Sequence, residues 1–582
     1  MSKKITGYPS IDKPQNKGYS IFKQNPLIPN ISIYNGIRML NAFYSENQAI
    51  DCMDLTVNYS ELFDDAITIS KAFKELGVKK GEIISVHMPN YYQAVAVFLA
   101  SNRIGAVTTF LNANAKENEI CEYLNLFESP ILINYDKTRE ENTNIKSKSN
   151  VRYIITLQKS KINTRSLNED YTITGNTSSI DFNSLGSISR FQKCGLPSNS
   201  GKDNSLILYT SGTTGKPKSV VLTNENVLAA ATYLKNSSNV KTLNGNRTLV
   251  CVPFSYPYGF VTSTLMTLLS SKTAVLAPNI SKDTIRYYIN KRPNIIFGSP
   301  ALLELFMKNT NNTDDLSSIT TFISGGDFLT PSQRKMGEEF FKNHGALDVE
   351  IGNGSGNAET VSCGTNPTGV EPRPETVGKI LVGTTAIVVD SNTMEEKKYN
   401  EVGLLCVSGK HVFKEYYNNA ELTSEVKFER KGKVYFKTGT LGSIDEDGYF
   451  TLTGRESRFY INSSLNKIYC DRVQTIISNI EGISECAVVK VPNEEFLYVN
   501  KAYIVLDKNS ELYDESMIKE VLSSSIQTLN GLVQLKDYEV PQYIEFVSEL
   551  PKKAGTDKIN YSLLEEDAFS KLNHEKVKIK FK

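Results

Sequence analysis

One ten-residue stretch carries the residue types that bind a chain of phosphates. It reads Tyr-Thr-Ser-Gly-Thr-Thr-Gly-Lys-Pro-Lys from Tyr209 to Lys218 and follows an apolar run. Its glycines let the backbone turn tightly and point N–H groups inward, while its hydroxyls and lysines add donors and positive charge. It is not a Walker A loop, because proline follows Lys216. We predict a phosphate loop between a strand and a helix that begins near Asn224. Its candidate ligands are Thr210, Ser211, Gly212, Thr213, Thr214, Gly215, Lys216 and Lys218.

The stretch at 209–218 resembles the phosphate-loop signature of the adenylate-forming superfamily, which contains acyl- and aryl-CoA synthetases, peptide-synthetase adenylation domains and luciferases. The resemblance covers nearly the whole chain, and Gly7–Pro14 is similar to the start of bacterial fatty-acid-CoA-ligase-like members. It implies that ATP activates a carboxylic acid as an acyl-AMP with release of pyrophosphate, and that a thiol then takes the acyl group. It also makes Thr214 a candidate for catalysis and for metal binding.

The segment Pro253–Gly259 resembles the part of the family that lines the carboxylate pocket. Tyr256 falls on the position of an aromatic gate, and Gly259 and Gly325 are the other candidate pocket residues. Members that activate amino acids usually carry an aspartate here, which pairs with the ammonium group of the substrate. This segment has none, so we expect a fatty or aryl acid.

Two further segments resemble nucleotide contacts of the family. Ser324–Asp327 is similar to a glycine turn where the backbone lies against adenine, which glycine permits because it lacks a side chain. Asn353–Glu359 is similar to the segment that carries an Mg²⁺ ligand, and Glu359 is that hard oxygen donor. Ser355 stands where the family has an adenine-stacking tyrosine, and Ala358 replaces a threonine. The candidate nucleotide contacts are Gly325, Gly326, Asp327, Asn353, Gly354 and Ser355.

The ribose end of the nucleotide site departs from the family. Lys437–Gly442 resembles its Thr-Gly-Asp-x-Gly segment, but Thr440 replaces the aspartate that accepts hydrogen bonds from both ribose hydroxyls. A lost charge-assisted pair would cost about 1.5–3 kcal/mol of nucleotide binding. Arg455 matches the arginine that closes the nucleotide site.

A lysine near the C-terminus is the main catalytic candidate. Leu550–Asn560 resembles the C-terminal motif of the family, and Lys558 falls on its catalytic lysine. A single lysine in a charged tail is usually solvated surface, but the register with the other motifs favours catalysis. Ser463–Leu465 replaces a glycine-containing turn on the face where the family forms the thioester.

Three functions fit these residues. The first is an acyl-CoA ligase that uses ATP, Mg²⁺ and CoA. The second is an acyl-AMP ligase that loads the phosphopantetheine thiol of an acyl carrier protein or stops at the adenylate, which the altered turn at 463–465 favours. The third is a degenerate member that binds a ligand or partner without turnover, which Ser355 and Thr440 favour.

The elements that must position these residues alternate between helix and strand. Apolar residues recur at three- and four-residue steps from Leu62 to Leu76, which predicts a helix. Short apolar runs predict strands at 83–88, 106–111, 205–209, 248–252, 294–298, 319–324, 386–389, 404–407 and 434–437. This alternation indicates an α/β fold of layered, mostly parallel sheets with a small β-barrel-like part after residue 370. The polar stretches 138–150 and 197–204 predict surface loops.

The chain is too long for one compact core. Its 582 residues predict an N-terminal ATP- and acyl-binding domain at 1–453, a hinge at 454–458 and a mobile α+β lid domain at 459–582. A net charge of +1, from 65 basic and 64 acidic residues, gives no overall field for nucleic acid. No apolar run is long enough to span a bilayer and no signal peptide is recognisable, so we expect a cytoplasmic protein. Scattered cysteines and histidines predict free thiols and surface or hydrogen-bonded core histidines, without a histidine-centred metal site.

Overall fold

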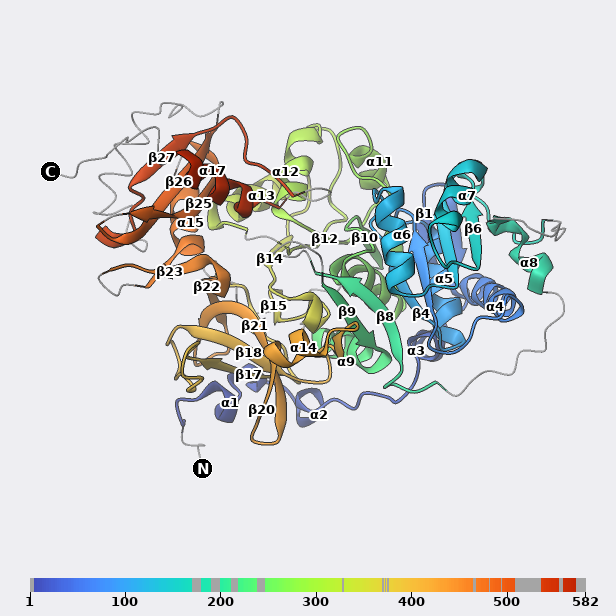
Figure 1. Ribbon diagram of the computed structural model, residues 1–582, viewed down its shortest axis with the longest axis horizontal. Coiled ribbons are helices and arrows are strands. Elements are labelled where there is room, and N and C mark those ends of the chain that lie inside the picture. The colour runs from blue at the N-terminus through green and yellow to red at the C-terminus, as the bar shows by residue number, and fades with distance from the viewer. Residues whose placement is uncertain are drawn as a thin grey trace.

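The computed structural model describes residues 5–169, 179–189, 199–210, 218–237, 246–326, 329–368, 371, 373, 376–463, 467–480, 482–493, 495–507, 535–553 and 558–571. Two large sheets with helices packed on them form the first part of the chain (Figure 1). A smaller antiparallel sheet and a C-terminal three-stranded sheet follow. The α/β class predicted from the sequence is confirmed.

The larger sheet carries the phosphate loop. Its strand order is β19-β9-β8-β4-β3-β5-β6-β7, and all neighbours are parallel except that β9 is antiparallel to both β8 and β19. Its strands are β3 (Ile83–His87), β4 (Val107–Phe110), β5 (Ile131–Tyr135), β6 (Tyr153–Leu157), β7 (Ile180–Asp181), β8 (Asn204–Tyr209), β9 (Ser219–Thr223) and β19 (Glu415–Tyr416). The helices before and between these strands are α4 (Tyr59–Glu75), α5 (Tyr92–Arg103), α6 (Glu117–Leu126), α7 (Arg139–Ser147) and α8 (Leu185–Ile188).

In the second large sheet, all strands except β2 are parallel, so the carboxyl ends of these parallel strands lie at one edge. Its order is β14-β13-β12-β10-β11-β1-β2, parallel throughout except at β2. Its strands are β1 (Gln48–Cys52), β2 (Leu55–Asn58), β10 (Arg247–Val250), β11 (Thr273–Leu276), β12 (Ile295–Gly298), β13 (Thr321–Ser324) and β14 (Glu350–Asn353). Helices between these strands or beside them are α3 (Ile33–Leu40), α9 (Asn224–Ser237), α10 (Met266–Leu268), α11 (Ile285–Asn290), α12 (Pro300–Asn309) and α13 (Pro331–Asn343). Ligands of open α/β sheets bind at the carboxyl ends of such strands.

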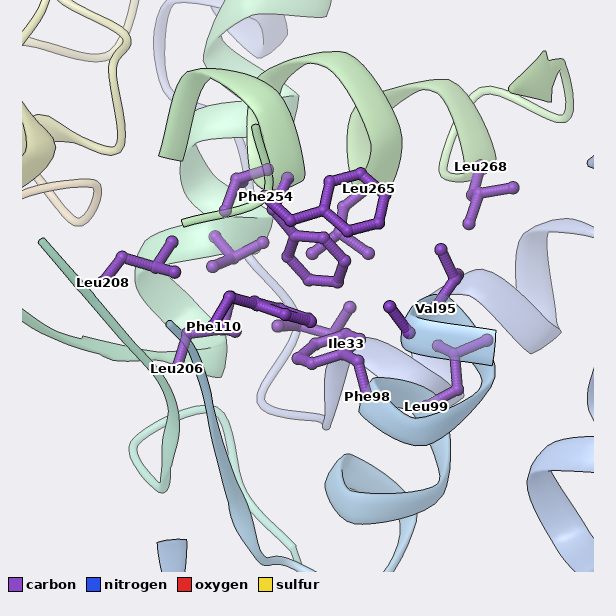
Figure 2. Close-up of a cluster of buried hydrophobic side chains, with 14 of the residues drawn as sticks. Ile33, Val95, Phe98, Leu99, Phe110, Leu206, Leu208, Phe254, Leu265 and Leu268 are labelled. Carbon is purple, nitrogen blue, oxygen red and sulfur yellow. The ribbon is translucent and has the colours of Figure 1, made fainter. Parts of the chain in front are cut away.

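A buried aromatic cluster fixes the segment that leads to the predicted acyl pocket. Phe98 of α5, Phe110 of β4 and Phe254 point toward one another in Figure 2. The Phe260 ring lies 4.9, 4.3 and 5.0 Å from the rings of Phe98, Phe110 and Phe254. Each such pair contributes about 0.5–1.5 kcal/mol beyond its buried area. The cluster therefore anchors the π-helical segment η5 (Tyr258–Leu265) against the larger sheet.

The later part of the chain is mainly antiparallel. Its first sheet has the order β17-β18-β21-β20, and β22 pairs with β21. These strands are β17 (Thr385–Val389), β18 (Gly403–Ser408), β20 (Lys427–Arg430), β21 (Lys433–Ile444) and β22 (Phe450–Arg455). The C-terminal elements are β23 (Phe459–Ile461), β24 (Lys467–Tyr469), α15 (Cys470–Ser478), β25 (Ile483–Asn493), β26 (Leu497–Leu506), β27 (Tyr543–Phe546) and α17 (Tyr561–Lys571). No helix in the described ranges is long and apolar enough to cross a membrane.

Local predictions failed at several elements and at two buried histidines. Residues 138–150 are not a loop: α7 begins with a capping box between Thr138 and Glu141, and its buried Ile145 packs into the core. Strand β9 was missed, because an apolar run directly before a helix gives no boundary signal. His87 and His411 are buried and none of their ring nitrogens has a side-chain hydrogen-bond partner among the described residues, so the expectation of hydrogen-bonded core histidines is wrong for both.

Candidate active site

A cleft of about 2710 Å³ opens where the two large sheets, the antiparallel sheet and the C-terminal part meet. It brings together most of the described residues that the sequence singled out. These are Thr210, Lys218, Tyr256, Gly325, Gly326, Asn353, Gly354, Ser355, Glu359, Arg455 and Lys558. Gly259 and Thr440 do not line it. The predicted residues Ser211, Gly212, Thr213, Thr214, Gly215, Lys216 and Asp327 lie outside the described residues.

The two ends of the phosphate loop are held together at the cleft wall. The amide of Thr210 donates to the carbonyl oxygen of Lys218 at 3.0 Å, and the amide of Lys218 donates to the Thr210 hydroxyl at 3.2 Å. Tyr209 pairs with Ser219 in the antiparallel register of β8 and β9. The loop therefore joins two strands of a hairpin. The helix predicted near Asn224 is confirmed, because α9 begins there, and the unpredicted strand β9 lies between it and the loop.

The carboxylate of Glu359 is held by a tyrosine that the sequence motifs did not indicate. Glu359 is 7% exposed, and the Tyr416 hydroxyl donates to its Oε1 at 2.5 Å. Burial and the negative charge of Glu359 raise the pKa of Tyr416, so the phenol remains a donor. No other hydrogen bond reaches this carboxylate within the described ranges, which leaves Oε2 available to a ligand.

Tyr416 also meets the phosphate loop. The Lys218 ammonium lies 5.4 Å from the centroid of the Tyr416 ring, within the range of a cation–π contact. The residue stands in β19, which pairs with β9 and thus joins the larger sheet at its edge. Its partner Glu359 is 57 residues earlier in the chain. Only this strand pairing brings the carboxylate and the end of the phosphate loop to one side chain.

The Gly325–Gly326 turn is packed closely at both glycines. Gly325 leaves no room for a side chain, and the side chain of Lys558 lies next to Gly326. A β-carbon at Gly325 would lie 3.0 Å from Cζ of Tyr258, whose hydroxyl donates to the Ile323 carbonyl oxygen at 2.7 Å. Gly326 has a φ of 85°, which favours glycine. A β-carbon there would lie 4.0 Å from Cε of Lys558. The side chain of Lys558 therefore reaches this turn from the C-terminal part of the chain.

The end of β14 offers one unpaired side-chain amide to the cleft. The amide of Gly354 donates to the Ser324 carbonyl oxygen at 2.8 Å, which sets β14 against the glycine turn. The side-chain Nδ2 of Asn353 is buried and has no hydrogen-bond partner. Asn353 lines the cleft, so this amide is placed to donate to a bound group. The backbone of Ser355 is fixed by a hydrogen bond from its amide to the Thr365 hydroxyl at 3.0 Å.

Thr440 contacts the predicted closing arginine. It is 2% exposed and lies opposite Arg455 in the register of β21 and β22. Nη1 of Arg455 donates to its hydroxyl at 3.1 Å, and the Arg455 amide donates to the carboxylate of Asp471 at 2.8 Å. Thr440 thus supports Arg455 from behind the cleft wall, and its predicted contact with ribose stays a prediction.

The described side chains that contact Tyr258, two residues after Tyr256, are uncharged. Burial raises the pKa of Tyr256, so its phenol is neutral. The Tyr258 ring meets Phe297 edge-on at 5.9 Å, and the Cys251 thiol donates to the Phe297 carbonyl oxygen at 3.4 Å. Burial raises the pKa of Cys251 to about 12, so this thiol is also neutral. Gly259 packs against the chain instead, because a β-carbon there would lie 2.3 Å from a backbone oxygen.

Comparison with known families gives two matches along the chain. Residues 41–417 match the family described as AMP-binding enzyme, and residues 472–556 match the AMP-binding enzyme C-terminal domain. A long-chain-fatty-acid–CoA ligase of Bacillus subtilis is 26% identical over 553 residues, which covers 93% of this chain and 95% of the relative.

Two solved structures share the fold. The ATP-bound MatB from Rhodopseudomonas palustris has a TM-score of 0.76 at 23% identity, covering 92% of this chain and 98% of that one. An anthranilate CoA ligase in complex with anthranoyl-AMP has a TM-score of 0.78 at 20% identity, covering 94% of this chain and 99% of that one. At these identities the likeness establishes the architecture.

Proposed function

Because the chain belongs to the AMP-binding enzyme family, we propose that it uses ATP to activate a carboxylic acid as an acyl-AMP and then transfers the acyl group to the thiol of CoA. The observation that carries this proposal is the position of Lys558 at the Gly325–Gly326 turn, in the cleft that Glu359 and both ends of the phosphate loop line. A cation, a buried carboxylate and a phosphate loop are the groups that nucleotidyl transfer needs.

The first half-reaction is a substitution at phosphorus. A carboxylate oxygen of the acid attacks the α-phosphorus of ATP, the bond from that phosphorus to the bridging oxygen of the β-phosphate breaks, and pyrophosphate leaves. Lys558 would bridge the carboxylate and the α-phosphate and neutralise the charge that builds there. The phosphate loop from Thr210 to Lys218 would hold the leaving pyrophosphate.

The buried carboxylate fits a magnesium ion. Oxygen donors suit Mg²⁺, and Oε2 of Glu359 is the one that has no hydrogen bond within the described ranges. Thr214 is the second proposed ligand. When bound, Mg²⁺ would balance the negative charge of the phosphates. The part that this chain plays is to keep Glu359 fixed through Tyr416.

The uncharged contacts of Tyr258, which lines the cleft together with Tyr256, support a fatty or aryl acid as the substrate. The described contacts of Tyr258 include no carboxylate that would pair with an ammonium group, as an amino acid substrate would require. The Bacillus subtilis relative is named a long-chain-fatty-acid–CoA ligase, and one structural neighbour is an anthranilate CoA ligase. Both classes of acid are therefore represented among the proteins that this chain is similar to.

The second half-reaction needs a thiol beside the acyl-AMP. We propose that the C-terminal part from residue 459 turns about residues 454–458, where β22 ends and the short 3-10 helix η7 (Glu456–Arg458) begins. The thiol sulfur then attacks the acyl carbon and AMP leaves. CoA is the proposed acceptor, and the phosphopantetheine thiol of an acyl carrier protein is the alternative.

Carboxylate-dependent exchange of labelled pyrophosphate into ATP tests the first half-reaction. We expect exchange with one or more members of a panel of fatty and aryl acids, followed by formation of the acyl-CoA when CoA is added. Folded protein that supports no exchange with any acid would refute acyl-AMP formation. Exchange without CoA acylation, but with loading of a carrier protein, would replace CoA by the alternative acceptor.

A further inference from the structure

Exposed apolar side chains concentrate near the N-terminus. Among the described residues, half of the large apolar side chains that remain exposed lie before residue 45. Phe22 is 84% exposed, and Leu27 and Phe43 are each 96% exposed. Single apolar side chains are normal on a protein surface, but a group on adjoining elements marks a binding surface.

These side chains come from two segments that share a neighbour. The helices α2 (Ile21–Gln24) and α3 (Ile33–Leu40) both contact α9, and Figure 1 shows them along the same lower edge of the molecule. The side-chain amide of Asn236, at the end of α9, donates to the Lys23 carbonyl oxygen at 3.2 Å. We call this area the N-terminal apolar surface; it consists of Ile21, Phe22, Leu27, Met39, Leu40, Phe43 and Tyr44.

Most charges around this surface are positive, although the exposed Glu46 follows it directly in the chain. Residues 13–45 contain four basic residues and no aspartate or glutamate. Two of these, Lys23 and Arg38, stand beside the apolar side chains, and Lys235 of α9 lines a hollow of about 670 Å³ together with Leu40 and Tyr44. Within the described part of the chain, Lys23, Arg38 and Lys235 form no ion pair.

We propose that the N-terminal apolar surface docks this enzyme on an anionic lipid bilayer. Phe22 and Phe43 would enter the boundary between headgroups and acyl chains, and the lysines and arginine would lie near the phosphates. Aromatic and aliphatic side chains next to basic ones are the composition that binds at this depth. A symmetric pair of copies joined through the same surface would instead bring Lys23 and Arg38 of both copies together, which repels. The proposal rests on no step of the activation reaction.

The absence of tryptophan from the sequence allows a sharp test. In the full chain, Phe43→Trp places a single reporter on the surface, and Leu347→Trp places one at a distant site that is 72% exposed. Both are titrated with vesicles of phosphatidylcholine, alone or mixed with phosphatidylglycerol. With the mixed vesicles only, we expect the emission of Phe43→Trp to shift to the blue and to be quenched by brominated lipid. Salt should reduce both effects. The emission of Leu347→Trp should not change.

Charge-reversal variants distinguish binding to anionic lipid from nonspecific hydrophobic adsorption. Each of Lys23→Glu and Arg38→Glu should lower the affinity for the mixed vesicles about fivefold or more. Arg38 is exposed and Lys23 is half-buried, and neither forms an ion pair in the described part of the chain, so the melting temperature should stay close to the wild-type value. Equal responses from the two tryptophans, or no sedimentation of the wild type with mixed vesicles, would overturn the proposal. A blue shift of Phe43→Trp that grows with protein concentration in the absence of vesicles would assign the surface to a second copy and overturn it too.

Discussion

Removal of the Tyr416 hydroxyl tests whether this residue holds Glu359 in place for a metal ion. In Tyr416→Phe the ring still faces the Lys218 ammonium, whose distance from the centroid is 5.4 Å, but the 2.5 Å hydrogen bond to Glu359 is lost. Because that bond is the one described contact of the carboxylate, the side chain of Glu359 becomes free to rotate and must be reoriented by the ion.

The size of the effect follows from the charge on the acceptor. A hydrogen bond to a charged group contributes about 1.5–3 kcal/mol, which corresponds to about 10–150-fold in an equilibrium constant. Partners behind a metal ligand typically change metal affinity about 10–100-fold. We therefore expect the Mg²⁺ concentration for half-maximal pyrophosphate exchange to rise about 10–100-fold. The KM for the acid should change little, because the described side-chain contacts of Tyr416 are with Glu359, Lys218 and Phe413.

Two measurements and one matched variant define the outcome. Pyrophosphate exchange is followed against free Mg²⁺, and Mg²⁺-dependent binding of a non-hydrolysable ATP analogue is followed by calorimetry. Tyr417→Phe makes the same chemical change one residue further on, where the ring packs against Phe127 at 5.1 Å. It should behave as wild type. A wild-type Mg²⁺ dependence in Tyr416→Phe, or equal shifts in both variants, would refute the reasoning.

Three further predictions follow from the cleft and the core. Lys558→Ala should lower pyrophosphate exchange about 10²–10³-fold at an unchanged melting temperature, because one preorganised positive group at the reacting phosphate is lost; full exchange would disprove its role. Gly325→Ala places a β-carbon 3.0 Å from Cζ of Tyr258 and should destabilise the fold by about 1–3 kcal/mol in urea unfolding. The added change Tyr258→Leu should restore most of that loss, and no restoration would exclude the clash as its cause. For His411, burial lowers the pKa from 6.5 to about 4. The unfolded chain therefore binds an extra proton between these values, so the free energy of unfolding should fall as the pH drops from 6.5 toward 4. His411→Leu should reduce that slope in urea unfolding, and an unchanged slope would contradict the assignment.

Much of the secondary structure could be predicted from the sequence. The apolar period from Leu62 to Leu76 predicted α4, whose capping box at Asn58 and Glu61 and following Gly77 set its ends. Short apolar runs predicted β3, β8, β12 and β13 to within two residues at either end. Those patterns succeed because a buried strand or helix face requires apolar side chains at a fixed spacing. The prediction of a loop at 138–150 was wrong because α7 has few apolar residues. Polar contacts, such as that of Asn142 with Thr156 at 2.9 Å, hold this helix to the sheet.

The sequence by itself determined the chemistry that the chain can offer. The string from Tyr209 to Lys218 carries a local residue pattern, and the segments with the glycine turn, Glu359 and Lys558 resemble motifs of the adenylate-forming superfamily, which can be recognised without coordinates. The tertiary structure alone decided which of these groups meet. The bond between Tyr416 and Glu359, the contact of Arg455 with Thr440 and the basic edge beside Phe22 and Phe43 all depend on pairing across sheets or packing between distant helices. These residues are far apart in the sequence. Neither the type of one residue nor its spacing predicts the identity of its partner.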